Sequence, residues 1–246
     1  MNKKAATANP LIRLQAQRAG YTDEMVIYLH ANATEGIDPY DTRKKLGSGA
    51  YPQLYAPVVD GILAVNSLPI PTQGSNLVVP VTLKSEVAGE VTLSLTELRA
   101  LAEGSEVYLV DKLQDITVNL LAQPSYTIDL ETAGELADRF EVVILMGEEQ
   151  AEDPIVDPTD PIGGINLTET HTQPGVTIYA HRNTIYVGNV QGRTQVTVVN
   201  IAGQRVLSRQ LEAEGLNAIH TNLPAGVYIV EARSQGGREV KRIFIE

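Results

Sequence analysis

The sequence predicts an all-β protein of two antiparallel β-sandwich domains that an acidic, proline-rich linker joins. Short runs of β-branched and aliphatic residues, mostly alternating with polar ones, recur at a spacing of roughly ten residues, which is typical of sandwiches. The pattern stops over residues 147–164 and then resumes. With 246 residues, of which 43% are hydrophobic and 20% charged, the chain is long enough for two domains with proper cores.

Residues 1–146 are expected to form a jelly-roll-like sandwich of about eight to ten strands. Residues 35–61 show no sustained period and predict a long loop with one short strand, a kind of loop that is usually functional or poorly ordered. The segment SLTELRALAEG is the one competitor for a short helix. The other expected strands are PLIRLQAQRA, EMVIYLHA, NLVVPVTLKSEV, EVTLSLTEL, SEVYLVDKL, ITVNLL, SYTIDLET and DRFEVVILM.

Residues 147–164 are interpreted as a stiff, solvated linker. They hold six acidic and no basic side chains, whereas residues 1–146 carry a net charge of −7 and residues 165–246 a net charge of +2. Repeated Asp-Pro pairs disfavour helix, and like charges extend the chain. Gly163 and Gly164 add a hinge at its end.

Residues 165–246 repeat the strand pattern in miniature and predict a small Greek-key sandwich of about seven strands. Gly203 in NIAGQ lies where a hairpin turn needs a positive φ. In LPAGVY, Pro224 fixes φ, Gly226 is expected to provide a bend, and Tyr228 starts a strand with a ring that covers one end of the core. The expected strands are VTIYAHR, TIYVGN, TQVTVVNIAG, QRVLSRQLE, LNAIHTN, GVYIVEAR and REVKRIFIE.

Composition excludes several classes of function. The chain has no cysteine, which rules out disulfides, thiolate metal sites and cysteine nucleophiles. A net charge of −11 argues against nucleic acid as the main partner. No apolar run is long enough for a transmembrane segment. The sequence lacks GxSxG, HExxH and a phosphate-binding glycine loop, and its four histidines are scattered, so we do not expect an enzyme.

The series TQVTVVNIAGQRVLSRQLEAEGLNAIHTNLPAGVYIVEA, with a terminal strand behind it, resembles the type A C-terminal sorting domain of the type IX (Por) secretion system of Bacteroidetes. The resemblance covers about a third of the chain, from residue 172 to the end. The chain departs from the family pattern in two places. Many members have Asp at the position of Ile201 or just before it, and this chain ends in RIFIE instead of on a basic residue. The positions that match the sorting motif are Asn200, Gly203, Gln204, Val206, Leu223, Pro224, Gly226, Tyr228 and Lys241.

This resemblance implies a secretion signal that works in the folded state. Such domains are recognised by an outer-membrane translocon after the protein has crossed the periplasm. A sortase-like cysteine protease then removes them and joins the cargo to anionic lipopolysaccharide. The protein is therefore expected to be secreted or held at the cell surface. We expect the cut between residues 147 and 172, near Gly163, Gly164 and Ile165, where the chain is accessible.

The N-terminus lacks the apolar stretch of a secretory signal. Under the sorting interpretation, this chain is expected to be the C-terminal part of a longer secreted protein. The alternative is a cytosolic assembly protein in which the turn motifs have arisen by chance.

Residues 1–146 resemble more loosely a β-module that often precedes this sorting domain in large Bacteroidetes surface proteins. Two hypotheses stay open for it, a structural spacer and a calcium- or glycan-binding adhesin module. Asp38 and Asp41 are the candidate calcium ligands, because calcium accepts oxygen ligands from irregular loops. Tyr40 and Tyr51 are candidates for stacking on a sugar, whereas Tyr55, in the same loop, is expected in the core with Leu54.

Overall fold

The computed structural model describes residues 8–72, 76–147, 176–235 and 237–245, and these residues form strands and connecting turns without any helix. The all-β fold class is therefore confirmed. The chain divides into two compact units, Met1–Glu148 and Glu149–Glu246. No helix in the described ranges is long and apolar enough to cross a membrane.

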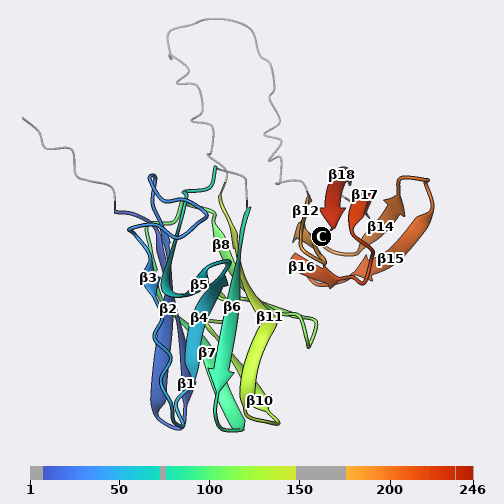
Figure 1. The fold of residues 1–246 in the computed structure, drawn as a ribbon. Helices are drawn as coiled ribbons and strands as arrows, with labels where there is room; N and C mark the ends of the chain where they lie inside the picture. Colours follow the sequence, from blue (N-terminus) through green and yellow to red (C-terminus); the bar gives the residue numbers. More distant parts are fainter. Residues whose placement is uncertain (1–7, 73–75, 148–175, 236, 246) are drawn as a thin grey trace, which may run out of the picture. The chain divides into compact units, whose positions relative to one another are not determined.

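The strands of the N-terminal unit run alongside one another, up and down its length (Figure 1). They are β1 Leu11–Arg18, β2 Tyr21–Leu29, β3 Thr42–Arg43, β4 Gln53–Val58, β5 Gly61–Leu68, β6 Asn76–Ser85, β7 Gly89–Arg99, β8 Glu106–Asp111, β9 Ile116–Asn119, β10 Ser125–Leu130 and β11 Gly134–Leu145. Hydrogen bonds connect them in the order β10-β7-β1-β2-β5-β4-β6-β11-β8-β9, and β3 pairs with β5.

The strands on either side of β4 in this order form two layers, and β4 belongs to both. Its first half, Gln53–Tyr55, pairs with β6, and its second half, Ala56–Val58, pairs with β5. Alternate residues of the strands point into the space between the layers, so that Ile12 and Leu14 of β1 are buried while Arg13 between them is half-buried. Together with their counterparts on β6, β7 and β11 they form one hydrophobic core.

Three details of the strands in the N-terminal unit differ from the expectation. Strand β5 follows directly after β4 and was not among the expected strands, and the loop before it holds β3 as well as β4. Strands β2 and β5 are parallel, which departs from a purely antiparallel sheet. A parallel pair needs a long crossover connection, and the thirty-odd residues between these strands supply it. SLTELRALAEG forms the end of β7 and a turn instead of a helix.

The C-terminal unit is a sandwich of a three-stranded and a four-stranded sheet, in the orders β12-β13-β16 and β15-β14-β17-β18. All strand pairs among its described residues are antiparallel. The chain crosses between the sheets after β13, β15 and β16, so that β16 pairs with β13 and β17 pairs with β14, as expected for Greek-key connections. Its own core lies between the two sheets. The strands are β12 Thr177–His181, β13 Thr184–Val190, β14 Thr194–Asn200, β15 Arg205–Leu211, β16 Gly215–His220, β17 Gly226–Ser234 and β18 Gly237–Ile245.

Candidate functional site

The turn between β14 and β15 is built around the side chain of Asn200. Its Oδ1 accepts hydrogen bonds from the backbone N–H groups of Ala202 and Gln204, both at 3.0 Å. Its Nδ2 donates to Oε1 of Gln204, also at 3.0 Å. Gly203 has a φ of 77° and donates its N–H to the carbonyl of Asn200 at 2.9 Å. The motif residues of this hairpin are therefore explained by the geometry of the turn.

Val206 lies just beyond this turn in a β-bulge. Val199 faces Arg205 and Val198 faces Leu207, so the residue between them has no partner on the neighbouring strand. The side chain of Val206 is 38% exposed, and Ile201 at the tip of the hairpin is 86% exposed. The hairpin therefore presents apolar side chains to solvent.

The Leu-Pro-x-Gly-x-Tyr stretch forms a corner before β17. The hydroxyl of Tyr228 donates a hydrogen bond to the carbonyl of Pro224 at 2.8 Å, and its ring is buried. Leu223 packs against the core cluster. A tyrosine that bonds back to the chain at this connection is a feature of immunoglobulin-like sandwiches, where it fixes the path between the two sheets. The expectation that Tyr228 covers the core is thus confirmed.

Gly226 acts differently from the expectation that it provides a bend. It is not among the glycines with positive φ, and it is the first residue of β17, opposite Ile245. An added Cβ would meet its nearest neighbours, Tyr228 and the carbonyl of Pro224, at 3.8 and 3.9 Å, which is ordinary van der Waals contact. Nothing in the described structure requires a glycine there.

The two motifs lie side by side on the four-stranded sheet. Asn200 at the end of β14 is the register partner of Tyr228 on β17, and Tyr228 in turn faces Ile243 on β18. Lys241 lies further along β18, opposite Val230. The structure thus brings the hairpin and the corner together and leaves Lys241 at the edge strand.

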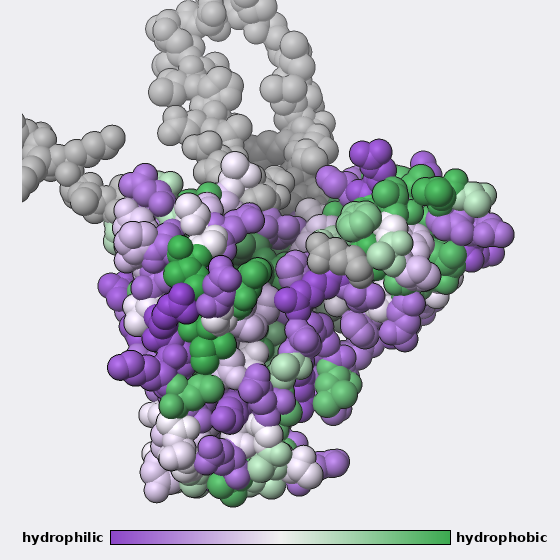
Figure 2. Space-filling model, viewed as in Figure 1, coloured by the Kyte–Doolittle hydropathy of each residue, from purple (hydrophilic) through white to green (hydrophobic). Residues whose placement is uncertain are grey.

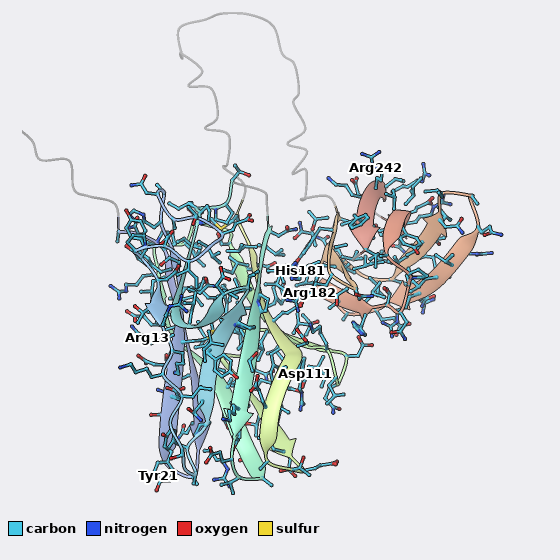
Figure 3. The ribbon with its side chains drawn as sticks, viewed as in Figure 1. Arg13, Tyr21, Asp111, His181, Arg182 and Arg242 are labelled. Carbon is cyan, nitrogen blue, oxygen red and sulfur yellow. The ribbon has the colours of Figure 1, made fainter. Side chains whose placement is uncertain are left out.

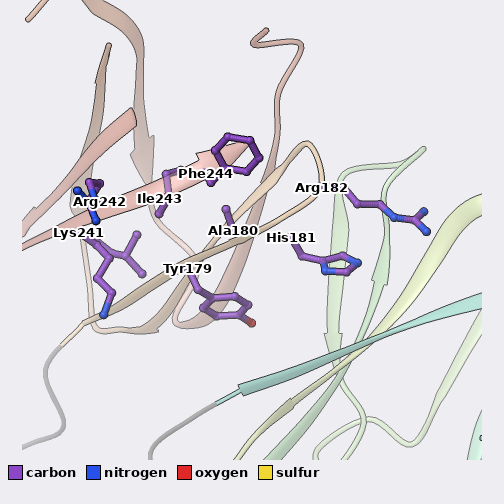
Figure 4. A pocket seen from close by; sticks show the side chains of 9 residues that line it. Tyr179, Ala180, His181, Arg182, Lys241, Arg242, Ile243 and Phe244 are labelled. Carbon is purple, nitrogen blue, oxygen red and sulfur yellow. The ribbon is translucent and has the colours of Figure 1, made fainter. Parts of the chain in front are cut away.

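Lys241 borders a shallow groove of about 340 Å³ between the edge strands β12 and β18 (Figure 4). Cationic side chains at this groove are Lys241, Arg242 and Arg182. Neither Lys241 nor Arg242 is in an ion pair with any residue that the structure describes. Because Lys241 and Arg242 lie on an edge strand and have no ion-pair partner among the described residues, the groove suits a carboxylate or phosphate group of a partner.

The outer face of the four-stranded sheet carries exposed apolar side chains that were not predicted from the sequence. Val227 faces Phe244 across β17 and β18, and Ile229 and Val240 lie on the same side of the sheet. These four side chains are between 40% and 58% exposed. The signal in the sequence was the uninterrupted apolar run of residues 227–230, which makes both faces of β17 apolar. In the view of Figure 2, hydrophobic residues lie among hydrophilic ones on the surface of each unit.

Asp38 and Asp41 lie together in one turn of the N-terminal unit, where backbone N–H groups donate hydrogen bonds to their carboxylate oxygens. Asp38 accepts hydrogen bonds from the N–H groups of Tyr40 and Thr34 at 2.8 and 2.7 Å. Asp41 accepts from the N–H groups of Asp38 and Ser67 at 2.8 and 2.6 Å. Desolvation would raise the pKa of Asp38, but the bonds from Tyr40 and Thr34 outweigh it and hold the pKa below its ordinary value.

These contacts explain the two aspartates as residues that cap a turn. Within the described ranges, no group of three or more His, Asp or Glu side chains is arranged to hold a metal ion. Calcium binding by Asp38 and Asp41 stays a prediction.

The tyrosines of the same loop have separate surroundings. Tyr55 is 2% exposed and Leu54 is fully buried, so both belong to the core as expected. Tyr40 is 38% exposed, and its ring centroid lies 4.1 Å from that of His30. The Tyr51 hydroxyl fills the space beside Gly47. Tyr40 therefore forms an aromatic row with His30 and Tyr28, which lie at the end of β2.

The expected processing region, Gly163, Gly164 and Ile165, lies outside the described residues, as does most of the linker. The histidines that the structure describes are His30 in the N-terminal unit and His181 and His220 in the C-terminal unit. The sequence expectation that the chain is not an enzyme stays a prediction for the N-terminal unit.

Comparison with known protein families gives a match in the C-terminal unit. A family model described as a secretion system C-terminal sorting domain matches residues 176–246. No curated protein matches the sequence.

Among solved structures, a biofilm-associated protein BSP domain is 16% identical with a TM-score of 0.26, over 67% of this chain and 29% of that chain. A Ruminococcus gnavus beta-glucuronidase is 9% identical with a TM-score of 0.19, over 65% and 35% of the two chains. A beta-D-glucuronidase from Dictyoglomus thermophilum is 12% identical with a TM-score of 0.17, over 88% and 45%. The matches therefore span less than half of each of these structures.

The family match begins at the strand that opens the C-terminal sandwich and runs to the last residue. It encloses both structured motifs, the Asn200 hairpin and the Tyr228 corner, and the edge strand that carries Lys241. Residues 176–246 are a C-terminal sorting domain of the type IX (Por) secretion system.

Proposed function

We propose that the C-terminal domain acts in its folded state as the signal for type IX secretion and surface attachment, and that the N-terminal unit is a structural spacer. The observation that carries the proposal is the match of a sorting-domain family to a segment with a hydrophobic core of its own. A self-contained core allows the domain to fold before the secretion machinery binds it.

The surface of this domain offers two features that suit a protein partner. The outer face carries the apolar side chains of Val227, Ile229, Val240 and Phe244, with Arg242 opposite Ile229 and Glu231 opposite Val240. Glu231 pairs with Arg238 at 3.0 Å and with Arg233 at 2.8 Å. The groove beside Lys241 is cationic. Apolar surface with a polar rim is typical of protein interfaces, and we infer that the translocon contacts the domain here.

We further propose that a sortase-like cysteine protease cuts near Gly163, Gly164 and Ile165 and joins the cargo to anionic lipopolysaccharide at the cell surface. The support lies in the sequence alone. Two glycines follow an acidic stretch with repeated Asp-Pro pairs, and such a stretch is accessible to proteases.

The spacer role of the N-terminal unit is supported by the ion pairs and hydrogen bonds that its charged side chains make within the unit. Strong pairs such as Asp111 with Arg139 and Asp23 with Lys44 are satisfied within the unit, and the candidate calcium ligands Asp38 and Asp41 cap a turn. A unit that satisfies its own charged groups suits a stable element between a surface anchor and an upstream region.

The experiment places residues 148–246 behind a signal peptide and a fluorescent reporter, in a bacterium with an intact type IX translocon and in a translocon mutant. We expect the reporter on the surface or in the medium only with the intact system, and mass spectrometry of the released reporter then locates the cut. Equal retention in the periplasm of both strains would contradict the proposal. The same reporter without residues 148–246 serves as the control.

A further inference from the structure

The N-terminal unit has a groove of about 410 Å³ on the outer surface of β1, β2 and β5. Its apolar lining comes from Leu11, Val26, Tyr28 and Val65, with Ala64 beside them. The register explains why they meet, because Leu11 faces Tyr28 and Val26 faces Val65 on neighbouring strands. A volume of this size falls within the range of small-molecule sites, roughly 300–1,000 Å³.

Charged side chains border this groove and neutralise one another. On one side, Nζ of Lys44 contacts the two carboxylate oxygens of Asp23 at 2.7 and 2.5 Å and donates to the carbonyl of Glu24 at 3.2 Å. Oδ2 of Asp23 also accepts from the N–H of Leu54 at 2.7 Å. These contacts fix the lysine and the carboxylate in position with no net charge.

On the other side, Arg13 forms ion pairs with Glu24 and, through Nε at 2.9 Å, with Glu97. The hydrogen bond from Arg13 holds the pKa of Glu97 below its ordinary value, and Glu97 in turn raises the pKa of Arg13, so both stay charged. Figure 3 shows Arg13 on the flank of the unit. The rim therefore offers hydrogen-bond donors and acceptors in fixed places while its charges largely cancel.

Tyr28 is held in place at one end of the groove. Its hydroxyl accepts a hydrogen bond from Nδ2 of Asn9 at 2.6 Å. Its ring stacks on His30 at 5.9 Å with an interplanar angle of 22°, and His30 contacts Tyr40 at 4.1 Å. Such an ordered aromatic row loses little conformational entropy when a ligand binds against it.

We propose that this groove binds a neutral oligosaccharide, with a sugar ring against Tyr28 and the apolar floor and its hydroxyl groups on the Arg13–Glu24 and Lys44–Asp23 rims. A sugar ring combines an apolar C–H face with several hydroxyls, each of which donates and accepts hydrogen bonds. An ionic ligand would have to break the rim pairs, whereas a neutral hydroxyl adds to them. The proposal does not depend on the sorting function of the C-terminal domain.

The test titrates the full chain with four neutral tetrasaccharides, cellotetraose, xylotetraose, maltotetraose and mannotetraose, and with anionic tetragalacturonate, by isothermal titration calorimetry. Tyr28→Ala removes the aromatic surface, and Ala64→Phe fills the groove without removing a contact. Tyr21→Ala is the matched control, because Tyr21 lies on the same strand, is 54% exposed and does not line the groove.

We expect at least one neutral tetrasaccharide to bind, with an affinity roughly tenfold lower in Tyr28→Ala and in Ala64→Phe and unchanged in Tyr21→Ala. Circular dichroism melting of each variant checks that it is folded. Three results would overturn the proposal: no binding of any neutral tetrasaccharide, tighter binding of tetragalacturonate, or equal affinity of the folded Ala64→Phe variant and the wild type.

Discussion

The side chains singled out in the two units make polar contacts of different range. In the N-terminal unit, Asp111 bonds Arg139, 28 residues away, and Arg13 bonds Glu97, 84 residues away. In the C-terminal unit, the motif residues bond within four positions, as Asn200 does with Gln204 and Tyr228 with Pro224. Short-range contacts leave a signature in the sequence, as the hairpin and corner motifs of the C-terminal unit do. Contacts between residues far apart in the chain, which both units contain, leave no such local signature.

Asp111 is the centre of a buried polar cluster in the N-terminal unit. Its carboxylate, 1% exposed, accepts two bonds from Arg139 at 2.9 and 2.7 Å and one from the Tyr126 hydroxyl at 3.0 Å. It also accepts from the N–H groups of Leu113 and Gln114 in the β8–β9 turn. One side chain thus connects that turn with β10 and β11. Figure 3 places it across the unit from Arg13.

The largest expected effect is that of Asp111→Ala. Removing one member of a buried ion pair leaves the other charge uncompensated, and the free energy of unfolding of the N-terminal unit should fall by about 3–5 kcal/mol. Differential scanning calorimetry of the full chain measures the melting of each unit. We expect the transition of the N-terminal unit to move down and that of the C-terminal unit to stay.

Glu97→Gln provides the matched control, since Glu97 also pairs with arginine but at the surface. Exposed pairs contribute little, so its effect should be much smaller than that of Asp111→Ala. Equal melting temperatures for Asp111→Ala and the wild type would contradict the importance of long-range polar contacts in this unit.

A smaller effect is expected in the other unit from Tyr228→Phe. The variant keeps the buried ring and loses the hydrogen bond to the carbonyl of Pro224, which should lower the free energy of unfolding of the C-terminal unit by about 1 kcal/mol. Urea denaturation, with each unit followed by NMR signals of its own, measures the loss. Tyr21→Phe at an exposed site is the control. A C-terminal unit as stable as the wild type would show that packing alone fixes the corner.

The same difference in range explains what the sequence could predict. The strands of the C-terminal domain and the Asn200 and Tyr228 motifs follow from local patterns and were predicted. Strand β5, its parallel pairing with β2, and the groove between them depend on residues far apart in the chain and were missed. Asp38 and Asp41 were singled out correctly as neighbours, but the sequence could not show that backbone N–H groups occupy their oxygens.

The smallest expected effect is a change in the pH dependence of stability, and it concerns the N-terminal unit. Burial, followed by the hydrogen bond to Asp111, raises the pKa of Tyr126 to about 12, whereas a tyrosine in an unfolded chain has a pKa of about 10. Between these values the unfolded chain loses the proton and the folded unit keeps it, so the stability that Tyr126 contributes is full below pH ~10 and is lost as the pH rises toward ~12.

In Tyr126→Phe this loss is absent, although the variant is less stable at neutral pH because Asp111 loses a donor. The difference in urea midpoint between wild type and variant should therefore shrink from about pH 9 to pH 11. Part of the alkaline loss should persist in both proteins, since burial also raises the pKa of Tyr55. A difference that stays constant over this range would mean that the hydroxyl of Tyr126 ionises as easily in the folded unit as in the unfolded chain.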